Sequence, residues 1–296
     1  MNKIIKMKYK MKQFISIAVL VFCLPVLQIQ AQGDMVLVAS GIFIQGCTDE
    51  QKPDCDGDEF PVHAVKLDSF LIGKYEVSQS EWETVMGDNP STNTACGSNC
   101  PVESIDWYSM LVYCNQQTLA NADLGASQLV YYKDEALTIA WSISDYNGNG
   151  DTTGENVFIN NEKSGYRLLT EAEWEYAARG GDLTAGFKYS GSDNIDEIAW
   201  YDLNSDDSIH ESGSKNPNEL GLYDMTGNVW ERVFDFQGDY ESPHICNPTG
   251  PIDGINKIYR GGSYTYSASS CRVADRYFNK PTRSSSNIGF RVARNN

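Results

Sequence analysis

The segment GYRLLTEAEWEYAARGG, residues 165–181, predicts a capped helix. Thr170 stands where the helix begins, and Glu173 follows three residues later, which is the spacing of a capping box. Trp174 falls on the side that this helix buries, and Gly180 is typical of the residue that ends a helix. A core around this tryptophan is therefore the starting point of the fold.

Upstream of this segment the sequence predicts two further helices and four strand-like stretches. Ser78 and Glu81 form a second capping box, and Gly87 ends that short helix. Apolar residues with helical spacing predict another helix over 104–120. The alternating stretches are 34–46, 63–78 and, on either side of an Asn/Gly-rich loop, 136–144 and 156–161.

Beyond residue 181 the sequence contains only short strand-like pieces among Asn, Gly, Ser and Asp. No linker, low-complexity tract or internal repeat divides the chain. These features predict an α+β fold, formed by a single domain with low regular secondary structure.

Residues 1–32 have the layout of a secretory signal peptide, with five lysines followed by an apolar run from about residue 14 to 27. The run is short for a membrane span, and Phe22 is too bulky for lipoprotein cleavage at Cys23. We therefore expect an exported chain, periplasmic, at the cell surface or secreted, with no transmembrane segment in its mature part. Loss of the five lysines changes the net charge from −17 to −17 − 5 = −22, which excludes nucleic acid and anionic lipid as partners.

Seven cysteines follow the signal segment, and export permits disulfides. Cys47 and Cys55 close one short polar loop and Cys96 and Cys100 another, so local bridges are expected. The three histidines are far apart in the sequence and form no zinc-binding pattern. Cys114 lies in an apolar helical run and is expected to be a small buried hydrophobic residue.

Six phrases, in this order, resemble the formylglycine-generating enzyme (sulfatase-modifying factor) family: GKYEVSQSEWETVMGDNPS, PVESIDWYSM, GYRLLTEAEWEYAARGG, NELGLYDMTGNVWERVFDF, YRGGSY and NIGFRVAR. The resemblance runs from about Met35 to Arg294. It implies one domain over 33–296 with the formylglycine-generating-enzyme fold, a variant of the C-type lectin fold.

Enzymes of this family oxidise a sulfatase cysteine to formylglycine, with O₂ and a copper ion held by two cysteines after a Gly-Gly-Ser turn. By the resemblance, counting forward from that turn, the first of these cysteines falls on Tyr266 and the second on Cys271. Counting backward from the following RVADR, Cys271 falls on a non-catalytic position. Either count leaves one thiolate missing, so we predict no catalytic residue and no copper site. Cys271 would be catalytic only in an oxidase, and otherwise it is a buried thiol or the disulfide partner of Cys246.

The phrase GLYDMTGNVWE implies, by the same resemblance, a structural calcium ion. Its ligands would be the side chains of Asp224 and Glu231 and the backbone carbonyls of Gly227 and Val229. The alternative is that the two acidic residues only cap a turn.

A weaker calcium candidate comes from the residues alone. Asp145, Asn147, Asn149 and Asp151 have the spacing of ligands in an EF-hand-like loop, but the bidentate Glu of such loops is missing. Asn-Gly pairs also favour a plain hairpin turn, which is the alternative.

Two sets of residues leave core and ligand-binding roles open. The tryptophans of the shared phrases are expected to pack in the core rather than stack on a sugar: Trp107, Trp174, Trp200 and Trp230. The C-terminal arginines are expected in internal ion pairs, the alternative being a groove for an anionic or peptide ligand: Arg260, Arg272, Arg276 and Arg291.

The sequence thus favours an exported non-oxidase domain that binds a protein, peptide or glycan ligand. The alternatives are a formylglycine-generating oxidase and a structural subunit of an envelope assembly.

Overall fold

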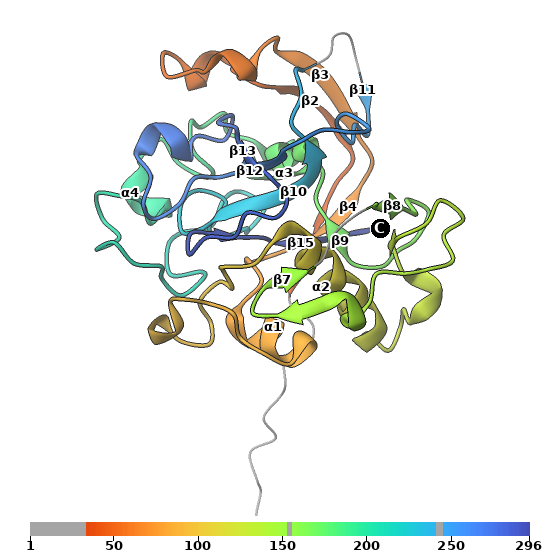
Figure 1. Ribbon diagram of the computed structural model, residues 1–296. Helices are drawn as coiled ribbons and strands as arrows, with labels where there is room; N and C mark the ends of the chain where they lie inside the picture. The colour runs from red at the N-terminus through yellow and green to blue at the C-terminus, as the bar shows by residue number, and fades with distance from the viewer. Residues whose placement is uncertain (1–33, 153–155, 241–244) are drawn as a thin grey trace, which may run out of the picture. The chain divides into compact units, whose positions relative to one another are not determined.

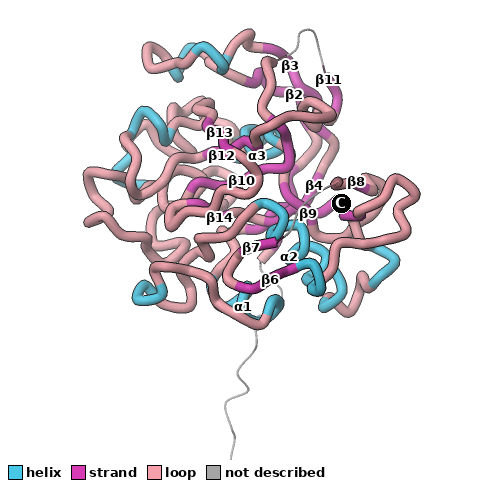
Figure 2. Tube along the Cα trace, in the orientation of Figure 1, coloured by secondary structure: helices cyan, strands magenta, loops and turns pink. Residues whose placement is uncertain are grey.

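The computed structural model describes residues 34–152, 156–240 and 245–296. Every helix and strand described below belongs to one compact unit within residues 31–296. The predicted signal segment lies outside the described residues. Loops connect short strands and few helices in this unit (Figure 1, Figure 2). The predicted α+β class with low regular secondary structure is confirmed.

Short strands form three sheets of three or four strands and two strand pairs. One four-stranded sheet has the order β1 (Met35–Val38), β4 (Phe70–Gly73), β15 (Val292–Asn295), β9 (Arg167–Leu168). The other has the order β13 (Tyr277–Asn279), β12 (Lys257–Arg260), β10 (Trp230–Phe236), β14 (Ile288–Gly289). The three-stranded sheet has the order β11 (Ile245–Cys246), β3 (His63–Leu67), β2 (Gly41–Gln45). The pairs are β5 (Tyr131–Tyr132) with β8 (Phe158–Ile159), and β6 (Tyr146–Gly148) with β7 (Asp151–Thr152).

The helices of the described residues are α1 (Gln79–Met86), α2 (Trp107–Ala120), α3 (Glu171–Ala178) and the one-turn α4 (Ile195–Ile198). The capping boxes predicted for α1 and α3 are both present. Gly87 ends α1 in the left-handed conformation, with φ 89°, as expected of a C-cap glycine. The second helix starts later than predicted because Asp106, not Ser104, caps it by accepting a hydrogen bond from the Ser109 backbone.

The predicted strands over 34–46 and 63–78 each divide into two, which corrects their length. The pairing of β1 with β4 and that of β2 with β3 share one antiparallel register, from Met35 opposite Gly73 to Gln45 opposite His63. Two short breaks, at 39–40 and 68–69, send the two halves into different sheets. The prediction of a strand over 136–144 is wrong, because that stretch forms a turn and a 3₁₀ turn that starts at Ile143.

Two large clusters of buried apolar side chains lie inside the unit. One surrounds α1 and α2 and includes Trp82, Trp107 and Trp230. The other packs α3 against strands of three sheets and includes Trp174. The core role predicted for Trp107, Trp174 and Trp230 is confirmed, whereas Trp200 is only half-buried and stacks on His210, with ring centroids 3.7 Å apart.

Both predicted local disulfides are present, Cys47–Cys55 and Cys96–Cys100. Each joins residues in a loop-rich stretch with little regular hydrogen bonding, where a covalent link limits the freedom of the unfolded chain. Among the described residues, no helix has the length and apolar character that crossing a membrane requires.

Candidate functional site

The C-terminal loop in which copper ligands were sought begins where β12 ends. Gly261 and Gly262 both have positive φ, 95° and 77°. A Cβ at Gly262 would lie 2.3 Å from the Sγ of Cys271, so only glycine lets the loop close over this thiol. Cys271 has no exposed surface, and burial raises the pKa of its thiol above the ordinary value. The Cys271 side chain therefore packs in the interior as a protonated thiol.

The other free thiols are in different places. Cys114 is buried in the α1–α2 core, and burial raises its pKa too, whereas Cys246 is exposed on β11. Cys271 belongs to a smaller apolar cluster with Tyr189 and Tyr201. The alternative of a Cys246–Cys271 disulfide is therefore wrong, because both residues are free.

Aromatic side chains occupy the position at which the resemblance would place the first copper-binding cysteine. Tyr266 packs edge-on against the buried Trp230, with ring centroids 5.2 Å apart, and also meets Tyr277. Tyr277 and Phe278 on β13 are 42% and 37% exposed. We call Trp230, Tyr266, Tyr277 and Phe278 the aromatic face.

Near this face lies a buried arginine that forms no ion pair with the described residues. Arg232 on β10 lies over the Tyr259 ring, and one of its nitrogens donates to the Tyr259 hydroxyl and to the carbonyls of Lys280 and Arg283. Its Nε and Nη1 atoms have no hydrogen-bond partner among the described residues. Burial lowers the pKa of this guanidinium to about 10. Nothing in the sequence distinguishes Arg232 from the arginines that form ion pairs.

The C-terminal arginines form internal ion pairs, as expected. Each guanidinium is buried, bonds a carboxylate and also donates to backbone carbonyls or to a further acid, which is the strongest kind of hydrogen bond available to it. The pairs are Arg260–Glu175, Arg272–Glu59, Arg276–Glu171 and Arg291–Glu231. They do not line a free groove for an anionic ligand, because their terminal guanidinium nitrogens are occupied within the fold. Nε of Arg260 has no partner among the described residues, but it is buried.

The predicted calcium loop is tightly curled. Asp224, Gly227 and Asn228 have φ values of 56°, 80° and 56°. The Glu231 carboxylate is held by Arg291 at 2.5–2.9 Å and by the Trp174 indole at 2.7 Å. Oδ2 of Asp224 accepts from the Gly213 backbone, whereas its Oδ1 is buried without a partner.

A third buried carboxyl group, that of Glu76, lies close enough to Asp224 and Glu231 to interact with both. Burial and these two neighbours raise the pKa of Glu76 well above its ordinary value, and burial also raises the pKa of Asp224. Three carboxylates facing one arginine have surplus negative charge, which fits a calcium ion. The unpartnered Oδ1 of Asp224 fits it as well, whereas the Glu231 side chain is bound to Arg291. Calcium here remains a prediction.

The loop that was the weaker calcium candidate folds as a hairpin, which was the alternative to a calcium site. β6 and β7 pair as an antiparallel hairpin, with Asn149 and Gly150 at φ 57° and 73° in the turn. Asp145 lies before the hairpin, and one of its oxygens is 2.6 Å from Nζ of Lys133. Among described residues, ligand atoms of three or more His, Cys, Asp or Glu side chains gather within 4.8 Å of one another in two groups: Cys47, Cys55 and Glu59, and Asp56, Glu59 and Asp275. Neither predicted calcium set is one of these groups.

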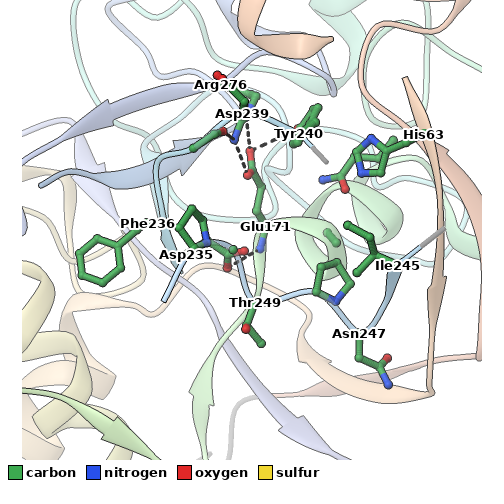
Figure 3. A pocket seen from close by; sticks show the side chains of 16 residues that line it. His63, Glu171, Asp235, Phe236, Asp239, Tyr240, Ile245, Asn247, Thr249 and Arg276 are labelled. Carbon is green, nitrogen blue, oxygen red and sulfur yellow. Dashed lines mark hydrogen bonds and ion pairs between the residues drawn. The ribbon is translucent and has the colours of Figure 1, made fainter. Parts of the chain in front are cut away.

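A polar pocket of about 310 Å³ lies beside the first turn of α3 (Figure 3). Glu171, the first residue of that helix, lies at its centre and binds Arg276 through both oxygens, at 2.7 and 2.8 Å. The Tyr240 hydroxyl donates weakly to the same carboxylate at 3.4 Å, and the Glu171 backbone donates to Oδ2 of Asp235 at 2.9 Å. His63 packs beside the Tyr240 ring, with centroids 4.8 Å apart.

Several polar atoms of this pocket have no partner within the described residues. They are Oδ1 of Asp235, the side-chain amide of Gln45 and Nε2 of His63, although all three residues are buried. Burial, with the Glu171 charge nearby, raises the pKa of Asp235 to about 8. This pocket could not be predicted from the sequence, because its walls come from β2, β3, α3 and the loop after β10, which no single motif connects.

Comparison with known proteins agrees with this architecture. Residues 25–296 match the FGE-sulfatase family, described as the sulfatase-modifying factor enzyme 1-like domain. The chain is 33% identical over 258 residues to the chaperone protein LppX of Paenibacillus barcinonensis, covering 81% of this chain and 82% of the relative. It is 29% identical over 293 residues to the formylglycine-generating enzyme of Mus musculus, covering 88% and 74%.

Among solved structures, Treponema denticola variable protein 1 is similar with a TM-score of 0.76 and 30% identity, covering 88% of this chain and 95% of that one. The fold expected from the resemblance is therefore confirmed. With a family match over residues 25–296 and the same fold, the chain belongs to the sulfatase-modifying factor enzyme 1-like (FGE-sulfatase) family.

Proposed function

We propose that this chain is an exported, non-oxidase member of the family that binds a protein, peptide or glycan ligand in the cell envelope or outside the cell. The observation that carries the proposal is the state of the thiols. Tyr266 and a fully buried Cys271 stand where the resemblance leads us to seek two copper ligands.

Cuprous copper needs soft donors such as thiolates, and two of them hold it in a nearly linear site. A metal-binding thiol must lose its proton, yet burial raises the pKa of both Cys271 and Cys114. The third free thiol of the described residues, Cys246, lies on β11 in the three-stranded sheet. The aromatic face instead includes residues of β10 and β13, which belong to a four-stranded sheet. These features support binding without oxidation.

The aromatic face supports a ligand-binding role. Tyr277 and Phe278 expose large flat side chains, which supply much contact area for little loss of side-chain freedom. Arg283 is exposed close by and adds positive charge in a strongly acidic chain. A relative named as a chaperone favours a protein or peptide ligand at this face.

Export is supported by the two disulfides, which persist in oxidising compartments. A structural calcium ion at the loop of Asp224, Gly227, Val229 and Glu231 is part of the proposal. It would offset the surplus charge of Asp224 and Glu76 and hold the curled loop.

The test has two arms on the same protein preparation. The first measures Cu(I) binding and oxidation of a sulfatase-motif peptide, and we expect neither. The second measures capture of partners from an envelope extract by the wild type and by the Tyr277→Ser/Phe278→Ser variant. We expect capture by the wild type and at least a tenfold loss in the variant, whereas Leu203→Ser, at another exposed apolar residue, should behave as wild type.

One equivalent of thiolate-bound Cu(I) together with peptide oxidation would contradict the proposal and favour the oxidase. Recovery of the chain only as a fixed part of a large complex, unaffected by the aromatic variant, would favour the structural subunit.

A further inference from the structure

The pocket beside α3 is a second candidate binding site, on the other part of β10 from the aromatic face. Trp230 of that face begins β10, whereas Asp235 and Phe236 at its end line the pocket. The pocket is therefore distinct from the surface to which the proposed function assigns its ligand. Residues 241–244 lie outside the described residues and are no part of the site.

The unpartnered polar atoms point to a ligand. Gln45 is 2% exposed and Asp235 is 3% exposed, and both line the pocket. Asp235 accepts one hydrogen bond, through Oδ2 from the Glu171 backbone, whereas Oδ1 of Asp235 and the Gln45 amide have no hydrogen bond to the described residues. Such groups are normally paired with protein, ordered water or a bound molecule. Several of them around one cavity define a polar recognition site.

The charges of the pocket favour an uncharged ligand. Glu171 and Arg276 neutralise each other through two short hydrogen bonds. Burial raises the pKa of Asp235 to about 8, so this carboxyl group is mainly protonated near neutral pH. Asp239 also lines the pocket, but it is exposed to solvent, which screens its charge. A charged ligand would lose its hydration without meeting a free opposite charge, which is costly.

The available groups can both donate and accept. The Gln45 amide offers donors and an acceptor, a protonated Asp235 offers both, and the Thr249 hydroxyl does the same. Ile245, Pro248 and Pro251 add apolar wall. The volume of about 310 Å³ is at the lower end of ligand pockets and suits a molecule of roughly a dozen non-hydrogen atoms.

We propose that this pocket binds one saccharide ring, whose hydroxyl groups match the mixed donors and acceptors and whose C–H face matches the apolar wall. The ring could be a free monosaccharide or the terminal unit of a glycan, and the two sources share this chemistry. The proposal does not depend on the absence of oxidase activity or on the aromatic face.

The test is ligand-observed NMR on the full chain. The probes are D-glucose, D-galactose, D-mannose and N-acetyl-D-glucosamine in one arm, soluble polysaccharides in a second, and spermidine and free lysine as cationic probes in a third. We expect a saccharide to bind with a Kd of about 1 mM or tighter. Binding of monosaccharides identifies a free sugar, and binding in the polysaccharide arm alone identifies a chain end.

Two variants place the binding in the pocket. Gln45→Leu removes the amide and should weaken binding at least tenfold, and Thr249→Val removes a hydroxyl at an exposed position and should weaken it severalfold. Gln116→Leu, the same change on α2, serves as the matched control and should bind as wild type. Urea unfolding of each variant shows whether a loss of binding reflects a loss of fold. If Gln45→Leu fails to fold, the saccharide affinity of Thr249→Val shows whether binding occurs in the pocket.

Absence of saccharide binding in both saccharide arms would overturn the proposal. So would binding of the cationic probes instead, or saccharide binding that Thr249→Val and Gln45→Leu leave unchanged. None of these results bears on copper or on the aromatic face, so the two proposals fail separately.

Discussion

Glu231 and Asp235 are buried carboxyl groups on the same strand, four residues apart, and their surroundings differ. Both oxygens of Glu231 accept from Arg291, and one also accepts from Trp174. Asp235 accepts one backbone hydrogen bond at the start of α3 and has one oxygen facing the pocket. We therefore assign Glu231 a structural role, whereas Asp235 keeps one oxygen with which it can bind a ligand. The two residues are both buried, so burial alone does not distinguish these roles.

The largest difference is expected from removing the charge of each carboxyl group. Glu231→Gln leaves the fully buried Arg291 without its counter-charge and should lower the free energy of unfolding by about 3–5 kcal/mol. Asp235→Asn replaces a group that is already mainly protonated and should change it by less than about 1 kcal/mol at pH 6. Urea unfolding measures both. Equal losses would contradict the distinction.

Calcium should act at the Glu231 end of the strand. At a concentration about a hundred times its Kd, the ion should raise the free energy of unfolding by about 2.7 kcal/mol. Asp224→Asn removes the side chain with the unpartnered Oδ1 and should abolish the increase. Thermal unfolding with calcium and with chelator measures the effect. If chelator has no effect on the wild type, the proposed calcium site is wrong.

The pH dependence should differ at the Asp235 end. The folded state holds the Asp235 proton up to a pKa of about 8, whereas the unfolded state has lost it above its ordinary value of 3.8. Its contribution to stability is therefore present at low pH and is lost as pH rises towards 8. Between pH 6 and 8 the wild type should lose about 2 kcal/mol relative to Asp235→Asn.

The comparison with Asp235→Asn is needed because Lys257, whose pKa burial lowers to about 7, acts in the opposite direction in both proteins. Urea unfolding at several pH values gives the difference directly. A constant difference across this range would show that Asp235 is ionised in the folded protein.

The smallest effect is expected at the hairpin. Asp145→Asn breaks a partly exposed pair with Lys133 and should lower the free energy of unfolding by about 0.5 kcal/mol. Because β6 and β7 form a plain turn, this variant should respond to calcium as the wild type does. A lost response there, with a normal response in Asp224→Asn, would move the calcium site to the hairpin.

Much of the fold followed from local chemistry. The capping boxes at Ser78 and Thr170 fixed the starts of two helices, since each depends on only four neighbouring residues. Short spacing likewise predicted both disulfides. The interruption of the long β1–β4 and β2–β3 register was not predictable, because it depends on which sheet each half joins.

The candidate sites were less predictable for the same reason. The internal pairing of the C-terminal arginines could be expected from an acidic, loop-rich chain, but their partners are up to 213 residues away. Arg232 resembles the other arginines in the sequence, and only the fold shows that its Nε and Nη1 atoms have no partner in the part of the chain that the structure describes. The pocket joins Gln45, Glu171 and Asp235 from three distant segments, so no spacing pattern could show it.

The measurement that tests the central claim most directly is native thiol labelling with peptide mapping, repeated after addition of Cu(I). We expect Cys246 to react rapidly and Cys114 and Cys271 to stay protected until the chain unfolds, with no protection of any thiol by copper. Rapid labelling of Cys271 in the folded protein, prevented by one equivalent of Cu(I), would contradict the account.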